Sequence, residues 1–424
     1  MKSLVVMIST LAAAAAVSAA STANFDFAAD ATNQFGVDLY RQLAAGDGNL
    51  CVSPYSVEVA LAMAFAGADG DTRMEMARVL HLPSDSDEIH ASFASLQQSL
   101  EQTRLKVAKA ADGSRETGEP SEPFALAIAN RLFAQRSYGF RDSFQTLLKR
   151  YYGAELGMLD FQKDAEGAKQ QINKWVADQT QDHIRDLIPD GGLDDRTRFV
   201  LANAIYFKAQ WLARFPETAT KPQPFHLRGG AAVDVPTMRK VDKGIGYSKH
   251  DGFTAVSIPY AGHELQLLVL LPDEVNGLSA LEAKLNAGLL GHCTKLNAQE
   301  VDLSLPKFKM EPPTIALVDK LQVLGMKSAF DLPSGSANFD RIAPRKPNDY
   351  LAISQVFHKT FMAVDEKGTE ASAATAVTGL RIASTSGFVP PRPIEIKVDH
   401  PFFYVIQHVP SGACLFIGRV TDPR

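Results

Sequence analysis

The amino-acid sequence predicts an α+β fold organised as one large domain. Segments with helical spacing of apolar residues occupy most of the first 184 residues, and short strand-like segments separated by turns follow from Val233 onward. Between them, residues 199–207 form a nearly continuous apolar run, which is typical of a central strand covered on both faces. No long linker interrupts the 424 residues, of which 46% are hydrophobic and 21% charged. This ordinary globular balance favours a single mixed domain.

The first 20 residues have the pattern of a secretory signal peptide. Lys2 precedes an apolar run over residues 4–17, and small residues at 18–20 provide a cleavage site. The apolar run is short and rich in alanine for a membrane anchor. We therefore expect a protein that is secreted or extracellular, or periplasmic in a bacterium, with residues 21–424 as the mature domain.

Seven segments are expected to form helices, and local signals mark some of their ends. Ser53 is a suitable N-cap, Pro54 suits the first position of the helix that follows, and Gly325 ends the last helix. The polar stretch 112–123, which contains Gly and Pro, is expected to be a surface loop. The expected helices are residues 25–43, 54–65, 72–80, 90–108, 144–152, 165–184 and 313–324.

Strands are expected where apolar residues alternate or run together over short lengths. Several of these segments follow one another with short turns, which is typical of antiparallel pairing. The expected strands are residues 125–134, 199–207, 252–259, 265–271 and 301–308.

Residues that carry enzymatic or metal chemistry are not grouped in any familiar pattern. The sequence contains no G-x-S-x-G, H-E-x-x-H, C-x-x-C, P-loop or G-x-G-x-x-G motif, and its ten histidines lack metal-ligand spacing. Cys51, Cys293 and Cys414 are expected to be buried small hydrophobes, with one disulfide left open. The formal net charge of −5 gives no general attraction to nucleic acid or to an anionic membrane. We therefore expect neither an enzyme nor a cofactor, metal, nucleic-acid or membrane partner.

One segment near the C-terminus, residues 366–377 with the sequence EKGTEASAATAV, is unusual because small residues follow a charged turn. In a strand, alternate side chains point to opposite faces. With Glu370 toward water, the other face would carry Thr369, Ala371, Ala373, Thr375 and Val377. Nothing bulky on that face prevents the segment from entering a sheet. Two interpretations remain open here: a solvated Ala/Ser/Thr linker, or a switch that can insert between two strands.

A series of short motifs occurs in order along the chain. The motifs are NLCVSPYSVEVALAMAFAGADGDT (residues 49–72), LANAIYFKAQW (201–211), LSLPKFKMEPP, LGMKSAFD, ISQVFHKTFMAVDEKGTEA, IKVDHPFFYVI (396–406) and LFIGRVTDP. Their order and spacing resemble those of the serpins, the serine protease inhibitor family, from about Asn33 to Pro423. The resemblance implies three β-sheets packed with eight or nine helices, and a reactive loop exposed at one end.

The resemblance also implies that residues 366–393 form the hinge and reactive loop of a suicide inhibitor. A protease attacks the loop as bait and forms an acyl-enzyme, and the cleaved segment beginning at Thr369 then inserts into the main sheet. The hinge is small throughout, which favours an inhibitory serpin over a non-inhibitory one that acts as a binding or chaperone-like protein. The implied partner is an extracellular serine protease, or alternatively a cysteine protease, held in a covalent complex by a serpin monomer. The hinge residues are Glu366, Gly368, Thr369, Glu370, Ala371, Ser372, Ala373, Ala374 and Thr375.

The position of the scissile bond follows from a count along the loop in the family. Fourteen residues past Gly368 the count reaches the Ile382–Ala383 bond, which suits an elastase-like or subtilisin-like protease. One residue earlier, the Arg381–Ile382 bond would suit a trypsin-like protease with an acidic pocket. The loop is longer than in many family members, because residues 384–393 add a Ser-, Gly- and Pro-rich spacer. The Phe388–Val389 bond is therefore a third candidate.

Polar residues set in apolar segments are further candidates for a functional role. Buried polar groups are nearly always hydrogen-bonded, so the simplest interpretation is that each makes local bonds. The resemblance implies instead that a group of them clusters beneath the main sheet as a shutter, which exchanges partners when its strands separate. The shutter residues are Ser53, Ser56, Asn203 and His358. Trp211 matches the breach, the point where insertion begins, and its alternative role is core filling.

Overall fold

The computed structural model describes residues 26–83, 88–116, 124–347, 349–369 and 392–424. Nine α-helices lie within these residues, in agreement with the predicted fold. No helix in that part of the chain is both long and apolar enough to cross a membrane. The helices are α1 (Asp26–Leu43), α2 (Pro54–Gly67), α3 (Gly70–Val79), α4 (Glu88–Glu116), α5 (Asp142–Tyr152), α6 (Ala165–Gln179), α7 (Leu278–Lys284), α8 (Ala287–His292) and α9 (Val318–Leu324).

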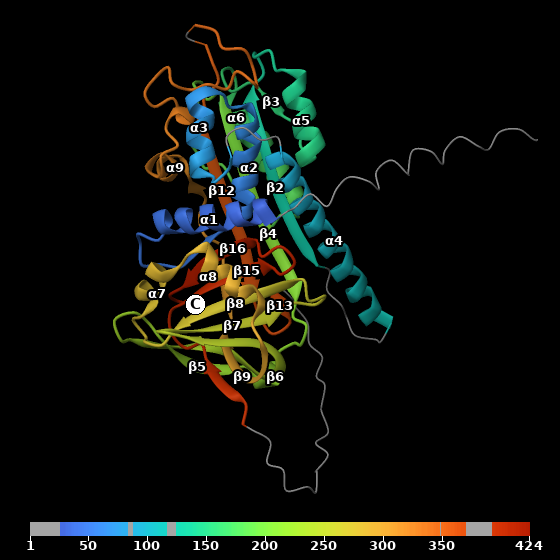
Figure 1. Ribbon diagram of the computed structural model, residues 1–424, viewed down its shortest axis with the longest axis vertical. Helices are drawn as coiled ribbons and strands as arrows, with labels where there is room; N and C mark the ends of the chain where they lie inside the picture. Colours follow the sequence, from blue (N-terminus) through green and yellow to red (C-terminus); the bar gives the residue numbers. More distant parts are fainter. Residues whose placement is uncertain (1–25, 84–87, 117–123, 348, 370–391) are drawn as a thin grey trace, which may run out of the picture.

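The first of two hydrogen-bonded sheet systems has seven strands among the described residues and carries the candidate site. Its strand order is β10-β12-β13-β4-β2-β3, with β11 also paired to β12. In Figure 1 its long strands β2, β4 and β12 run along the vertical axis, and helices surround their upper parts. Its strands are β2 (Ala125–Gln135), β3 (Gly157–Leu159), β4 (Phe199–Gln210), β10 (Phe308–Met310), β11 (Ile315–Ala316), β12 (Gln355–Val364) and β13 (Gly368–Thr369).

The second system has nine strands in the described chain, in the order β1-β16-β15-β8-β7-β6-β9-β14 with β5 paired to β6. The first part of the long strand β6 pairs with β5 and β9 and its last part with β7, and its register with β9 shifts between Asp242 and Ile245. Strand β6 therefore belongs to both ends of this strand order, and the predicted α+β class with several sheets is confirmed. The strands are β1 (Leu50–Val52), β5 (Lys221–His226), β6 (Ala232–His250), β7 (Phe253–Pro259), β8 (Leu265–Pro272), β9 (Ala298–Pro306), β14 (Ile394–Lys397), β15 (Phe402–His408) and β16 (Cys414–Val420).

Strand β4 is buried on both faces over most of its length, as its apolar run predicts. Leu201 and Ile205 face the larger core, which includes α2, whereas Ala202 and Tyr206 face a smaller core that includes α6. Because side chains alternate in a strand, odd-numbered residues of β4 point toward α2 and even-numbered ones toward α6. This division decides which helix each side chain of the candidate site meets.

Expectations that rest on local sequence hold for helix α2 and for the cysteines. The Ser53 hydroxyl accepts a hydrogen bond from the Ser56 N–H at 3.2 Å, and Pro54 begins the helix, which confirms the predicted cap. Every residue of α2 is buried, which explains why the helix is apolar on nearly all sides. The three cysteines are buried and free, so none of them forms the disulfide that the sequence had left possible.

Helix α4 is longer than the sequence predicts. It continues to Glu116, so the loop expected at residues 112–123 is wrong for its first five residues. Ala110 and Ala111 have the highest helix propensity, which offsets a cost of about 1 kcal/mol for Gly113.

The helix expected over residues 165–184 ends instead at Gln179. The Thr180 hydroxyl donates to a carbonyl of the last helical turn at 2.8 Å. Gln181 and Asp182 then adopt left-handed backbone angles, with φ of 52° and 64°. A left-handed backbone cannot continue a right-handed helix, so the chain leaves α6 at this point.

The helix expected over residues 313–324 is a short strand followed by a helix. Strand β11 pairs with β12, with Ile315 opposite His358, and α9 begins only at Val318. Pairing with a distant strand outweighs the helical spacing, because the β-branched Ile315 fits the pleated edge of β12 and its backbone groups gain partners there.

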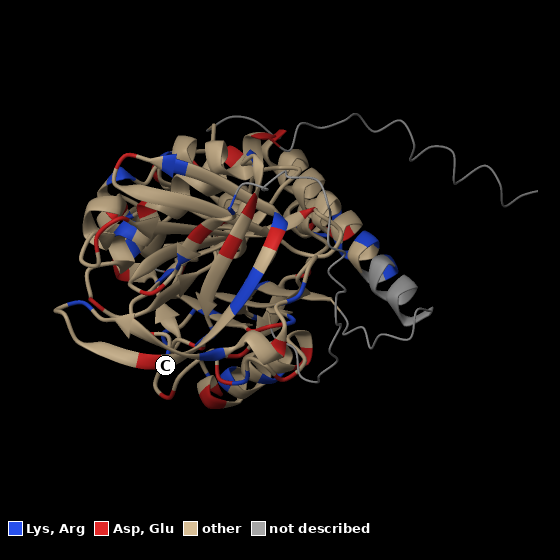
Figure 2. Cartoon of the chain, turned by 90° about the horizontal axis from the view of Figure 1, so that it is seen from below, with Lys and Arg blue, Asp and Glu red and all other residues tan. Residues whose placement is uncertain are grey.

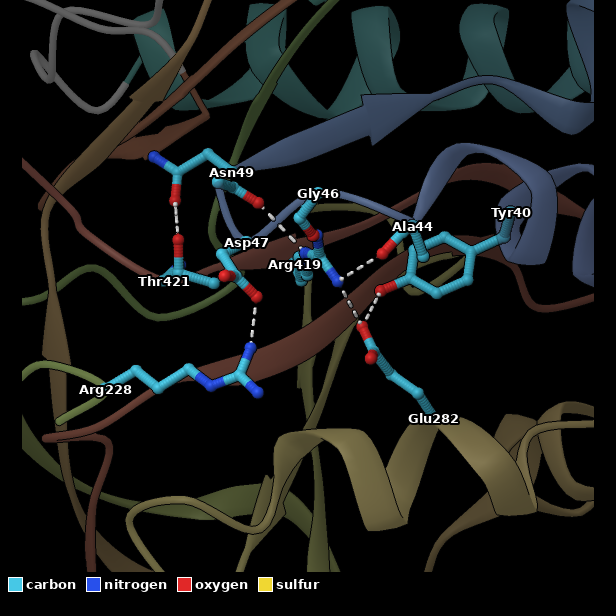
Figure 3. A network of polar contacts seen from close by, with 10 residues as sticks. Tyr40, Ala44, Gly46, Asp47, Asn49, Arg228, Glu282, Arg419 and Thr421 are labelled. Atoms are coloured by element: carbon cyan, nitrogen blue, oxygen red, sulfur yellow. Dashed lines mark hydrogen bonds and ion pairs between the residues drawn. The ribbon is translucent and has the colours of Figure 1, made fainter.

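A buried arginine joins the C-terminal strand to the N-terminal region (Figure 3). Arg419 of β16 is 5% exposed and donates to the Glu282 carboxylate of α7 at 2.9 Å. It also donates to the carbonyls of Ala44 and Gly48, at 3.3 and 2.9 Å. The same carboxylate accepts from the Tyr40 hydroxyl of α1 at 2.6 Å. These charge-assisted bonds hold α1, α7 and β16 together.

Charged residues of both signs share the end of the molecule seen in Figure 2. Across β6 and β9, Arg239 and Asp302 form a bidentate pair with N–O distances of 2.8 and 2.6 Å. On β14, Glu395 and Lys397 pair at 2.8 Å. The electrostatic potential at this end is therefore mixed in sign rather than uniformly basic.

Candidate functional site

Strands β4 and β12 meet along a boundary that opens at one end. They pair in parallel over seven residues each, up to Tyr206 opposite Phe361. Beyond that pair β13 lies between them, with Thr369 paired to both strands. We call the paired stretch the seam, and the point where β13 enters it the fork. A strand position between β4 and β12 is thus already occupied at the fork.

A tight turn sends the chain from β12 back into the fork. The Asp365 N–H donates to the Gly368 carbonyl at 2.8 Å. The Asp365 carboxylate accepts from the N–H groups of Lys367 and Gly368, at 2.9 and 3.2 Å. Aspartate side chains commonly stabilise turns in this way. Strand β13 therefore runs antiparallel to β4 and β12 and points along the seam.

Gly368 has no room for a side chain. A Cβ atom at this position would lie 1.9 Å from the carbonyl oxygen of Ala209. The close approach of β13 to β4, rather than an unusual backbone angle, therefore requires glycine at the hinge.

Thr369 is fully buried, and its hydroxyl lies 2.7 Å from the Tyr260 hydroxyl. The expectation that insertion starts at Thr369 after cleavage is therefore corrected, because Gly368 and Thr369 already lie in the sheet of the uncleaved chain. The facing edges of β4 and β12 present N–H and C=O groups that need partners, and β13 supplies them. The other predicted loop residues, namely Glu370, Ala371, Ser372, Ala373, Ala374, Thr375, Arg381, Ile382, Ala383 and Phe388, lie outside the described residues.

Trp211, the predicted breach residue, lies against the turn. Its indole N–H donates to the Asp365 carbonyl and its backbone N–H to the Lys367 carbonyl, at 2.8 and 2.9 Å. The ring stacks on Tyr260 with centroids 4.5 Å apart. Trp211 thus contacts the hinge and also fills the core, so its position fits both interpretations, and a role in insertion stays a prediction.

Glu366 anchors the turn to residues that directly precede strands β5 and β10. Its carboxylate accepts hydrogen bonds from Lys307 Nζ and Thr220 Oγ1, each at 2.8 Å. Burial alone would raise the pKa of Glu366, but these bonds and the charge of Lys307 outweigh it and hold the pKa below its ordinary value. The carboxylate therefore stays ionised and fixes the turn next to β10.

A row of polar side chains crosses the seam at mid-length. Asn130 of β2, Asn203 of β4 and His358 of β12 are register partners across three strands of the sheet. They face the start of α2, where Ser53 and Ser56 lie. We call these five residues the polar row. The structure thus brings the four predicted shutter residues together with Asn130, and their role as a shutter stays a prediction.

Hydrogen bonds link all five members of the polar row. The Ser53 backbone N–H donates to His358 Nε2 at 3.0 Å, so that nitrogen carries no proton and Nδ1–H donates to Asn203 Oδ1. The Asn203 amide donates to Ser56 Oγ at 2.6 Å and to Asn130 Oδ1. Ser56 Oγ in turn donates to Asn130 Oδ1 at 3.0 Å, and the Asn130 amide donates to the Ser56 carbonyl at 3.1 Å.

Burial keeps His358 neutral. The ring is fully buried, which lowers its pKa to about 3 from an ordinary value of 6.5. A neutral imidazole offers one donor and one acceptor, which match its two partners. The polar row is therefore uncharged and fully bonded.

Sequence reasoning missed three residues at this site. Asn130 is one of only two polar residues, with Arg131, in the expected strand 125–134, which is a signal that could have found it. Tyr260 and Lys307 carry no local signal, because their part in the site depends on contacts with Thr369 and Glu366 across the fold.

Comparison with known proteins identifies the family. A family model described as serpin (serine protease inhibitor) matches residues 30–423. An uncharacterized serpin-like protein from Thermococcus kodakarensis is 38% identical over 93% of this chain and 85% of its own length. A leukocyte elastase inhibitor from Bos taurus is 36% identical over 93% of this chain and 98% of its own length.

Solved structures agree with the fold. A tumour suppressing serpin matches with a TM-score of 0.78 and 27% identity, covering 94% of this chain and 100% of that one. Serpin48 from the insect Tenebrio molitor matches with a TM-score of 0.74 and 32% identity, covering 96% of this chain and 100% of that one. The chain belongs to the serpin family of protease inhibitors and is not an enzyme.

Proposed function

We propose that this serpin inhibits serine proteases as a suicide substrate, and that residues 370–382 form the loop segment that inserts after cleavage. The observation that carries the proposal is the position of β13. It occupies the first two residues of a strand position between β4 and β12 and points along the seam. A loop that continues in this direction becomes a full strand of the sheet.

The register of β13 determines where each further residue of the loop would lie. Thr369 pairs with Ala209, and in an antiparallel strand each next residue pairs with one residue earlier on β4 and on β12. Continued in this register, Thr375 arrives opposite both Asn203 and His358. Insertion would separate those two residues, and the Thr375 hydroxyl would offer a donor and an acceptor between them.

Alternation along the inserted strand also accounts for the composition of the hinge. Thr369 faces Tyr260 and the larger core, so Ala371, Ala373 and Thr375 would face the same way. These small side chains suit a core that is already closely packed. A large side chain would strain that core, and a charged one would be buried without a partner, so either would slow insertion.

In the proposed mechanism the covalent bond between protease and loop persists, while the active-site geometry of the protease is disrupted. The serine Oγ of the protease attacks the bait carbonyl carbon, the peptide bond to the next residue breaks, and the leaving amine takes a proton from the protease histidine. An ester then links the protease to the loop. Insertion of the roughly thirteen residues 370–382 at ~3.3 Å each would carry that ester roughly 43 Å. Displacement of the ester from the oxyanion hole leaves its hydrolysis by water slow.

The bait bond in this proposal is Ile382–Ala383, with Arg381–Ile382 and Phe388–Val389 as alternatives. Relatives 33–36% identical to this chain are named leukocyte elastase inhibitors, which supports a target with an elastase-like preference for aliphatic residues. Export through the signal peptide at residues 1–20 is part of the same proposal, and it places the target protease outside the cell.

The test is incubation with elastase, subtilisin, trypsin and chymotrypsin in separate reactions. A covalent complex that survives a denaturing gel is the expected result, and the mass of the released C-terminal peptide identifies the bond. Cleavage without complex in every reaction, with no rise in the melting temperature of the cleaved protein, would overturn the proposal and favour a non-inhibitory serpin. A large rise without complex would support insertion and indicate that the target is another protease.

A further inference from the structure

Residues 180–188, which we call the strap, cover the face of the seam opposite the polar row. The strap follows α6 directly, and its second and third residues are the left-handed Gln181 and Asp182. Asn173 of α6 holds its far end through two hydrogen bonds with the backbone of Ile188, at 3.0 and 2.8 Å. Ile184 and Leu187 of the strap are buried in the smaller core together with residues of β4 and β12.

His183 of the strap contacts both strands of the seam. Its ring stacks on Tyr206 of β4, with centroids 3.9 Å apart and an angle of 8° between the planes. The same ring lies 5.4 Å from Phe361 of β12, and the rings of Tyr206 and Phe361 are 5.8 Å apart. Tyr206 and Phe361 are the last register pair before the fork. A single imidazole therefore bridges the two strands at the level where they must first part.

A second contact ties the strap to β12. Lys359 Nζ donates to the carbonyl of Asp186 at 3.3 Å, and that carbonyl also accepts from the Thr314 hydroxyl at 3.2 Å. Lys359 lies two residues before Phe361, so both side chains project from the same face of β12. The strap therefore meets β12 at two levels of the seam.

We infer that His183 is a positioning residue that controls when the seam opens. The inference rests on the proposed function, because it concerns the step in which the cleaved loop enters the sheet. Any strand that advances from β13 must part Tyr206 from Phe361, and His183 cannot then keep both ring contacts. These contacts slow insertion relative to hydrolysis of the ester. Their strength thus sets the fraction of protease that is trapped rather than released.

The test is the annealing of a synthetic peptide, with the sequence of residues 370–381, to the intact protein. A peptide that fills the strand position raises the melting temperature, so the rate of that rise measures opening of the seam. His183→Ala is expected to take up the peptide about tenfold faster, which is the scale of an aromatic contact. His183→Phe retains a ring that stacks and is expected to restore the wild-type rate.

The matched control is His250, whose ring stacks on Phe253 in the other sheet system, with centroids 4.6 Å and planes 4° apart. His250→Ala removes a similar contact away from the seam, and it should leave the uptake rate unchanged. If His183→Ala does not fold, His183→Leu replaces it, because leucine fills the space and cannot stack. A wild-type uptake rate in the variant that folds, or an equal acceleration by His250→Ala, would overturn the inference.

Failure of this inference is distinguishable from failure of the proposed function. Wild-type protein that takes up no peptide overturns the role of His183, and complex formation with a protease then decides the proposed function separately. Wild-type protein that takes up peptide as fast as the His183 variants overturns the role of His183 alone, whether or not a complex forms.

Discussion

His358 and Asn203 are hydrogen-bonded to each other across the seam, and they are also register partners on β12 and β4. The side-chain bond and the backbone pairing therefore break together when a strand enters between them. Ser56 and Asn130 are bound to Asn203 on the β4 side of the seam, so they are able to stay with it. The bond between His358 and Asn203 is the one that an inserted strand has to replace.

Asn130→Ala should lower the free energy of unfolding by about 1–3 kcal/mol. The substitution removes the acceptor of one Asn203 amide hydrogen and the donor to the Ser56 carbonyl, and both groups are buried. Urea denaturation at pH 7 measures the change. A variant with the wild-type midpoint and slope would contradict the bonding described for the polar row.

The stabilisation that His358 contributes to the folded protein should fall as the pH drops from 7 towards 4. The folded pKa of His358 is about 3, below its ordinary value of 6.5, so between these values the unfolded chain binds a proton that the folded chain excludes. The stabilisation from this group is complete above about pH 6.5 and is lost towards pH 3, at about 1.4 kcal/mol per pH unit. His408, whose pKa burial lowers to about 4, contributes in the same direction.

Urea midpoints at pH 7, 6 and 5 check this dependence. His358→Gln and His408→Gln should each reduce the slope of stability against pH by about one proton. If both variants keep the wild-type slope, the two rings do not exclude a proton in the folded state.

Gly368→Ala should expel β13 from the fork, because the added Cβ would collide with the Ala209 carbonyl. Trp211 would then lose its contact with the turn, and its fluorescence should change in a Trp175→Phe background that removes the second tryptophan. Gly139→Ala is the control, because a Cβ there meets nothing within 4 Å. Identical emission spectra for the two variants would argue against β13 in the fork.

Thr369→Arg should convert the inhibitor into a substrate. The position is fully buried between β4 and β12, so an arginine there would carry an unpaired charge into the sheet. On a denaturing gel, the yield of covalent complex should drop by about tenfold or more in favour of cleaved protein. Thr369→Ser keeps the hydroxyl that meets Tyr260 and should match the wild type. If Thr369→Arg and Thr369→Ser give equal yields of covalent complex, position 369 is not part of the inserted strand.

Features that depend on near neighbours in the chain could be predicted from the sequence. The Ser53 cap and Pro54 set the start of α2 through contacts within one turn. The apolar run at residues 199–207 required a strand covered on both faces, because no solvated face remains in it. The order of motifs identified the family, and the small residues of the hinge indicated a segment able to enter a sheet.

Contacts between distant parts of the chain set where that segment begins and which residues it meets. Asn130 and Asn203 join His358 because the register of three strands aligns them, and no local pattern in the sequence encodes that register. Ile315, expected in a helix, pairs instead with the edge of β12. Strand β13 lies in the fork of the uncleaved chain. The physical reason is the same in both cases: an open strand edge needs hydrogen-bond partners, and the packing of the whole fold selects the segment that supplies them.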